Sequence, residues 1–159
     1  MKIRVGLGYD VHQLKEGNEF WLGGIKIPHT KGAVGHSDAD TLIHAICDAL
    51  LGAANLGDIG NHFPNTSEEF KGMDSKKFLK QVYSMLKKNG YEIGNVDCTV
   101  ALQQPKIAPH IPEMKNIIAE ILKMPVKNIS IKATTTERLG FVGREEGVEA
   151  HAVALLMGY

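Results

Sequence analysis

The stretch KIRVGLGYDVH, residues 2–12, alternates strictly between two kinds of residue. Its odd-numbered positions are apolar, and its even-numbered positions are charged, polar or glycine. A period of two predicts a β-strand with one face in the hydrophobic core. We therefore expect the apolar positions to face the core, and Asp10 and His12 to project together from the opposite face.

The pattern of the remaining chain mixes strands and helices without a strict β-α-β repeat. It predicts a hairpin in FWLGGIKIP that turns at Gly23-Gly24, helices within 36–57, 75–89 and 111–123, and strands near 95–104, 128–136 and 148–157. Ser37 or Asp38 is expected to cap the first helix. Because the early hairpin is antiparallel, we expect an α+β fold: a single domain, residues 1–159, with a mixed β-sheet covered on one face by helices.

The overall composition narrows the classes of function. The 159 residues are 43% hydrophobic and carry 18 basic and 18 acidic side chains, so the formal net charge is zero. This balance argues against broad binding to nucleic acid or an anionic membrane. We read neither a membrane-length apolar run nor a secretory signal. Cys47 and Cys98 are expected to be buried thiols in a reducing cytoplasm.

One carboxylate and two imidazoles form the first candidate site. His44 lies within an apolar helix, in LIHAICDALLG, and Asp10 and His12 share one strand face. Three such ligands suit a catalytic zinc ion, because they leave the fourth tetrahedral position open. Asp48, one turn after His44, is a candidate to hold the second nitrogen of that imidazole. A solvated strand face, a core histidine and an exposed helix charge are the alternatives for these residues.

Two further segments carry groups suited to phosphate. His36 and Ser37 precede a helix N-terminus, where free N–H groups favour anions. In KATTTE, residues 132–137, the threonine hydroxyls could donate to phosphate oxygens, with Glu137 as an Mg²⁺ ligand. Ordinary capping and plain β structure are the alternatives.

Several segments together, in order and spacing, resemble one family across essentially the whole chain. They are GYDVHQL, GGIKIP, GHSDADTLIHAICDALLGAANLGDIG, PKIAPHIPEM and IKATTTERLGFVGREEG. The chain resembles the 2-C-methyl-D-erythritol 2,4-cyclodiphosphate synthases of the methylerythritol phosphate route to isoprenoid precursors, in their single-function form. The resemblance implies an intramolecular attack of the 2-phosphate of 4-diphosphocytidyl-2-C-methyl-D-erythritol 2-phosphate on the β-phosphorus, with release of CMP.

The resemblance also implies roles for individual residues. Zinc, or another divalent transition metal, would bind at Asp10, His12 and His44, and Mg²⁺ or Mn²⁺ at Glu137 with the substrate phosphates. His36 and Thr135 would stabilise the transition state. The implied substrate contacts are Ser37, Asp58, Ile59, Gly60, Phe63, Asn65, Leu102, Lys106, Ile107, Ala108, Thr134, Thr136, Phe141 and Arg144.

Members of this family are homotrimers with active sites between neighbouring subunits, so the resemblance implies the same assembly here. It also implies that an isoprenoid diphosphate binds in the trimer cavity, near Arg144. Asn65 stands where an aspartate is common, and His62 and His151 match no assigned position. Two other classes stay open: a zinc-dependent phosphohydrolase, and a non-catalytic isoprenoid- or nucleotide-binding trimer.

Overall fold

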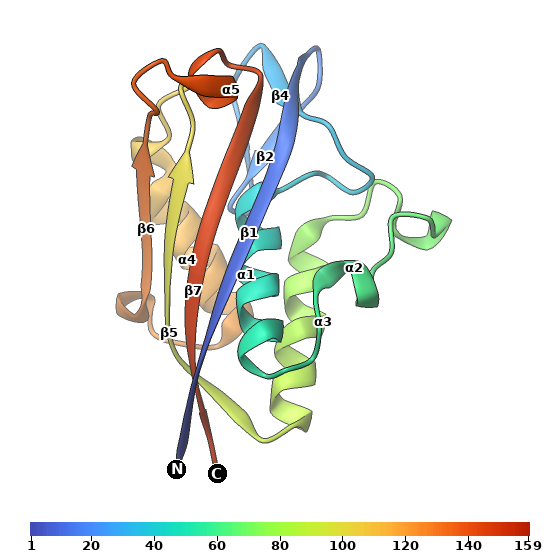
Figure 1. Cartoon of the computed structure of the whole chain (residues 1–159), viewed down its shortest axis with the longest axis vertical. Coiled ribbons are helices and arrows are strands. Elements are labelled where there is room, and N and C mark those ends of the chain that lie inside the picture. Colours follow the sequence, from blue (N-terminus) through green and yellow to red (C-terminus); the bar gives the residue numbers. More distant parts are fainter.

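The computed structural model describes residues 1–159 and contains a five-stranded sheet in the order β4-β1-β7-β5-β6, together with the two-stranded hairpin β2-β3 (Figure 1). The strands are β1 (Lys2–Glu16), β2 (Phe20–Leu22), β3 (Ile25–Ile27), β4 (Lys31–Ala33), β5 (Tyr91–Ala101), β6 (Ile129–Thr134) and β7 (Gly147–Gly158). β7 pairs antiparallel with β1 and β5, whereas β5 and β6 are parallel. The sheet is therefore mixed, as predicted.

Helices complete the α+β architecture that the sequence predicts. They are α1 (Thr41–Ala53), α2 (Ile59–His62), α3 (Ser75–Lys88), α4 (Ile111–Leu122) and α5 (Gly140–Gly143), with short 3₁₀ turns at Glu68–Phe70, Ala108–His110 and Val126–Asn128. The apolar side chains of α1, from Leu42 to Ala53, are buried. None of these helices has both the length and the apolar character needed to cross a bilayer.

The orientation of β1 is the reverse of the one predicted. Ile3, Val5 and Leu7 are 61%, 64% and 67% exposed, whereas the even-numbered positions face α1. The reason is close approach of helix and strand: a Cβ added at Gly8 would lie 1.8 Å from the carbonyl oxygen of Ala45. Glycine on this face lets the α1 backbone rest directly on the strand.

Asp10 and His12 consequently lie on the helix-packed face of the sheet rather than on its non-core face. They follow Gly8 on the same side of β1, and Leu14, two residues further along, is 5% exposed. This inversion brings both side chains against α1, the helix that carries His44.

The first helix begins later than predicted. Its N-cap is Asp40, whose side chain accepts the N–H of Ile43 at 3.0 Å, so neither Ser37 nor Asp38 caps it. The same carboxylate accepts the N–H groups of Gly23 at 2.9 Å and Gly24 at 2.7 Å, which ties the hairpin turn to the helix. Burial raises the pKa of Asp40, and repulsion from the Asp38 carboxylate acts in the same direction.

Other boundaries shift by a few residues. β5 begins at Tyr91 and ends at Ala101, whereas 95–104 was expected, and β6 ends at Thr134. The segment 58–74, for which the sequence predicts no helix or strand, contains α2 and a 3₁₀ turn. Asp58 caps α2 by accepting the N–H of Asn61 at 2.9 Å. Hydrophobic periodicity does not predict such short helices, because a single turn contains no repeat.

Candidate active site

A cavity of about 380 Å³ lies beside α1 and brings together nine of the predicted site residues. Segment 35–37, before α1, and the chain from α2 to residue 70 form much of its wall. The predicted residues that line it are Asp10, His12, His36, Ser37, His44, Ile59, Gly60, Phe63 and Asn65. Sequence reasoning missed the others, Gly35, Pro64, Thr66, Phe70 and Phe78.

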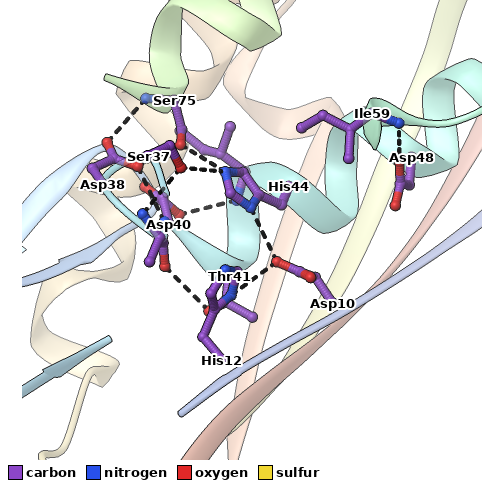
Figure 2. Close-up of polar contacts among 12 residues, drawn as sticks. Asp10, His12, Ser37, Asp38, Asp40, Thr41, His44, Asp48, Ile59 and Ser75 are labelled. Carbon is purple, nitrogen blue, oxygen red and sulfur yellow. Dashed lines mark hydrogen bonds and ion pairs between the residues drawn. The ribbon is translucent and has the colours of Figure 1, made fainter. Parts of the chain in front are cut away.

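Three of the lining side chains converge on one point (Figure 2). Asp10 Oδ2 lies 3.1 Å from His12 Nδ1 and 3.1 Å from His44 Nδ1. The three potential ligand atoms all lie within 4.8 Å of one another. Two atoms that each bind a tetrahedral zinc ion at about 2.0–2.1 Å would be roughly 3.3 Å apart, so this donor set fits a divalent transition metal.

The electrostatics of the cluster favour a bound cation. Burial opposes ionisation of Asp10, but the hydrogen bonds and charges of His12 and His44 outweigh it and hold the pKa of Asp10 below its ordinary value. Burial likewise disfavours the charged form of His44, but Asp10 outweighs it and raises the pKa of His44. A carboxylate held ionised between two imidazoles is suited to bind a metal ion.

The second nitrogen of His44 does not meet Asp48, which corrects the prediction. His44 Nε2 lies 2.8 Å from Ser75 Oγ and 3.3 Å from Ser37 Oγ (Figure 2). Asp48 instead accepts the N–H of Ile59 at 2.7 Å and so anchors the start of α2 to α1. Burial raises the pKa of Asp48. One helical turn separates Asp48 from His44, but the His44 ring points away from it, toward α3.

A hydrogen bond and aromatic packing hold the cavity wall that lies opposite the cluster. The His36 ring donates from Nε2 to the carbonyl oxygen of Ser67 at 2.7 Å, which joins the segment before α1 to the loop that contains Ser67. Phe63 stacks on Phe78 with ring centroids 4.6 Å apart, and Phe70 packs edge-on against both. The amphipathic pattern of α3 predicts Phe78 to be buried, but nothing in the sequence distinguishes a cavity wall from a core.

The second group of predicted residues lies elsewhere. Thr134 is the last residue of β6, and Thr135, Thr136 and Glu137 follow it. The backbone N–H of Leu102 donates to the Thr134 carbonyl at 2.9 Å. None of these residues, nor any in the segment 102–108, lines the cavity. β7 and β5 separate β6 from β1, which is three strand spacings or roughly 14 Å.

The turn after β6 has an unusual backbone. Glu137 and Arg138 have φ values of 54° and 64°, a left-handed conformation that non-glycine residues seldom adopt. Thr135 Oγ1 accepts the N–H of Glu137 at 3.2 Å, which stabilises the turn. Backbone strain of this kind is concentrated at functional sites.

The remaining predicted contacts differ in what they present. Leu102 and Ile107 are buried, whereas Lys106 and Ala108 are exposed. Phe141 lines a separate cavity beside Val11. Arg144 donates from Nε to Glu146 Oε1 at 2.8 Å, and this bond raises the pKa of Arg144 and lowers that of Glu146.

Comparison with known proteins gives one consistent result. The sequence profile of the YgbB family matches residues 3–157. A 2-C-methyl-D-erythritol 2,4-cyclodiphosphate synthase of Cytophaga hutchinsonii is 63% identical over 99% of both chains. One of Parabacteroides distasonis is 61% identical over 98% of this chain and 97% of its own.

Solved structures agree with the sequence comparison. An IspF–CDP complex of Plasmodium falciparum has a TM-score of 0.87 at 36% identity, over 98% of this chain and 96% of its own. A bifunctional IspDF of Campylobacter jejuni has a TM-score of 0.95 at 41% identity, over 99% of this chain. This chain spans 43% of that bifunctional protein.

Proposed function

The chain belongs to the YgbB family, and from that membership we propose that it performs the reaction for which its relatives are named, the formation of 2-C-methyl-D-erythritol 2,4-cyclodiphosphate. The substrate would be 4-diphosphocytidyl-2-C-methyl-D-erythritol 2-phosphate. Its 2-phosphate attacks the β-phosphorus, the bond from that phosphorus to the CMP oxygen breaks, and CMP leaves. The enzyme class is therefore a cyclising phosphorus–oxygen lyase in isoprenoid biosynthesis.

The convergence of Asp10, His12 and His44 in one cavity is the observation that carries this proposal. Attack of one anionic phosphate on another requires the two groups to be held together against their repulsion. Zinc, or another divalent transition metal, would bind these three side chains and supply positive charge to a phosphate oxygen. Mg²⁺ or Mn²⁺ would bind at Glu137 with the nucleotide phosphates.

The other residues divide between the two ends of the substrate. The methylerythritol moiety would lie in the cavity against Ser37, Ile59, Gly60, Phe63 and Asn65. Asp58 would contact it from the N-cap of α2, next to Ile59. The cytidine diphosphate would contact residues 102–108 and 134–137, and the loop that carries Phe141 and Arg144. His36 and Thr135 would donate to phosphate oxygens as charge moves onto the leaving group.

We propose that the complete site forms between two subunits of a homotrimer. Two observations support this assembly. The cluster and the segment 134–137 are separated by two intervening strands within one chain, too far to bind a single diphosphate. The sheet face opposite α1 exposes the apolar side chains Ile3, Val5, Leu7 and Val153, which a monomer would leave in water. Helices would then cover one face of the sheet and neighbouring subunits the other.

Two further features belong to the proposed assembly. The interior that these apolar faces would enclose suits an isoprenoid diphosphate, and a melting temperature unmoved by geranyl or farnesyl diphosphate would remove that idea. Cys47 and Cys98 are buried and unpaired, which supports a reducing compartment such as the cytoplasm.

A ³¹P NMR assay tests the proposed reaction. The purified protein, with zinc retained and Mg²⁺ added, is incubated with the CDP-methylerythritol 2-phosphate. We expect stoichiometric CMP and a pair of coupled diphosphate resonances, both abolished by EDTA. Free phosphate without a cyclic product would indicate a phosphohydrolase, and absence of turnover by zinc-loaded protein would indicate a binding protein.

A further inference from the structure

The second ring nitrogen of His44 ends on a chain of buried polar groups. Ser75, the first residue of α3, is fully buried, and its Oγ lies 2.8 Å from His44 Nε2 (Figure 2). The Ser75 hydroxyl donates in turn to Asp38 Oδ1, and the Ser75 backbone N–H donates to Asp38 Oδ2 at 2.9 Å. The carboxylate of Asp38 therefore accepts both donor groups of Ser75.

This arrangement gives the chain of hydrogen bonds a direction. An ionised carboxylate can only accept hydrogen bonds, so the hydroxyl hydrogen of Ser75 points at Asp38. Ser75 Oγ is left with lone pairs for His44, and Nε2 must therefore be the donor. A neutral imidazole with its proton on Nε2 has a lone pair on Nδ1. Nδ1 is the nitrogen that lies 3.1 Å from Asp10 Oδ2, in the three-residue cluster.

We propose that Ser75 and Asp38 are a positioning pair that holds the proton of His44 on Nε2 and so presents the lone pair of Nδ1 to a metal ion. The inference rests on the proposed function in one respect, that Asp10, His12 and His44 bind a metal. Ser75 and Asp38 do not line the cavity, so they act through His44 and not on the substrate.

Ser37 is a weaker partner for the same nitrogen. Its Oγ lies 3.3 Å from His44 Nε2 and accepts the N–H of Ala39 at 3.2 Å. No carboxylate fixes the direction of its hydroxyl hydrogen, and Ser37 lines the cavity, where a ligand or solvent competes for it. Ser75 is shielded from both.

Ser75 and Asp38 also connect α3 to the metal-binding cluster. Asp38 belongs to the segment before α1, and its backbone N–H donates to the Met73 carbonyl at 3.1 Å, just before α3 begins. His44 lies on α1 itself. The pair therefore sets the rotation of the His44 ring relative to the two helices that meet beside the cavity, as outer partners of metal-binding histidines commonly do.

Nitrogen NMR of the unmodified protein tests the proposal without a substitution. Long-range ¹H–¹⁵N spectra of zinc-loaded protein with labelled histidine distinguish the protonated ring nitrogen from the metal-bound one. We expect the His44 proton on Nε2 and the metal on Nδ1. The reverse assignment would overturn the proposal.

Cobalt binding to a variant tests the contribution of the hydroxyl. Ser75→Ala removes the acceptor of the Nε2 proton, and we expect Co²⁺ affinity, followed by visible absorption against a competing chelator, to fall about 10–100-fold. Ser84→Ala is the matched control, because Ser84 lies exposed on the same helix and donates only to the Lys80 carbonyl. Equal Co²⁺ affinity in Ser75→Ala and in the unmodified protein would contradict the proposal.

These measurements separate the positioning pair from the proposed reaction. If the protein binds Co²⁺ with the His44 proton on Nε2 but forms no cyclic diphosphate, the proposed reaction is contradicted and the positioning role of Ser75 and Asp38 is supported. If it forms the cyclic product with the His44 proton on Nδ1, the positioning role is contradicted and the proposed reaction is supported.

Discussion

The Asp10–His12–His44 cluster and the segment 134–137 differ in how their side chains are held. The cluster is partly buried, and each of its members is bonded to a group from another part of the chain. The segment is largely exposed, and its threonine hydroxyls bond only to neighbouring residues in the same turn. One chain therefore preorganises the cluster by itself, whereas the side chains of the segment make no hydrogen bond to another part of the chain.

Removing one ligand should have the largest effect on the cluster. His44→Ala is expected to lose the metal and at least about 10³-fold of the activity, because charge stabilisation at the phosphates goes with it. The assembly should survive, since the side chain points away from the exposed sheet face. Metal analysis and sedimentation check both statements, and unchanged zinc content in this variant would count directly against the cluster.

Charging the exposed sheet face should disable the segment without touching the cluster. Leu7→Glu places a carboxylate on the apolar face opposite α1, so we expect the proposed trimer to dissociate. Activity should then fall by about as much as it does when one half of the site is removed. Sedimentation velocity measures the assembly. Ser84→Glu, which adds the same charge to the exposed side of α3, is the control, and a trimer that tolerates both changes would contradict the interface.

Filling the contact between β1 and α1 should damage the cluster through its scaffold. Gly8→Ala would place a Cβ 1.8 Å from the Ala45 carbonyl oxygen, so we expect a loss of about 3 kcal/mol or more in unfolding free energy. Gly52→Ala is the control, because its Cβ would approach nothing closer than 4.0 Å. That substitution should stabilise α1 by about 0.5–1 kcal/mol. Denaturant unfolding measures both, and similar free energies would contradict the packing.

The smallest expected effect is a pH dependence of the metal-free protein. The pKa of His44 is raised above its ordinary 6.5, so its pairing with Asp10 stabilises the fold fully below that value. The stabilisation is lost as the pH rises through the folded pKa. We expect the melting temperature to decline more steeply above pH 6.5 in the unmodified protein than in His44→Gln. Parallel melting curves for the two proteins would argue against this pair.

The sequence predicts the class of fold and the membership of the cluster but not its orientation. Alternation places Asp10 and His12 on one side of β1, and this is correct because side chains in a strand must alternate. The prediction assigns the wrong side of β1 to the core, because it takes the hydrophobic side chains of Ile3, Val5 and Leu7 as a sign of burial. The sequence alone does not show that the sheet has a second apolar face, which lies exposed in the single chain. Gly6, opposite Ala49, and Gly8, opposite Ala45, are the signal that indicates the side of β1 that packs on the helix.

The contacts beyond the cluster depend on geometry that spacing does not contain. Asp48 is one turn from His44 and was the natural partner for its ring, yet ring rotation directs Nε2 to Ser75, 31 residues away. The same limit applies to the segment 134–137. The sequence predicts that its threonines donate to phosphate oxygens and that Glu137 binds Mg²⁺, but their distance from the cluster follows only from the strand order.

Mixing two inactive variants tests most directly whether one site draws on two chains. His44→Ala removes the cluster, and Glu137→Gln removes the carboxylate of the segment, so each trimer alone should be inactive. In trimers assembled from equal amounts of both chains, each interface has an intact cluster and an intact segment with a probability of about one quarter. We expect recovery of about a quarter of the unmodified activity. A mixed trimer that stays as inactive as its parents would contradict a site shared between chains, because both halves of the site would then have to come from the same chain.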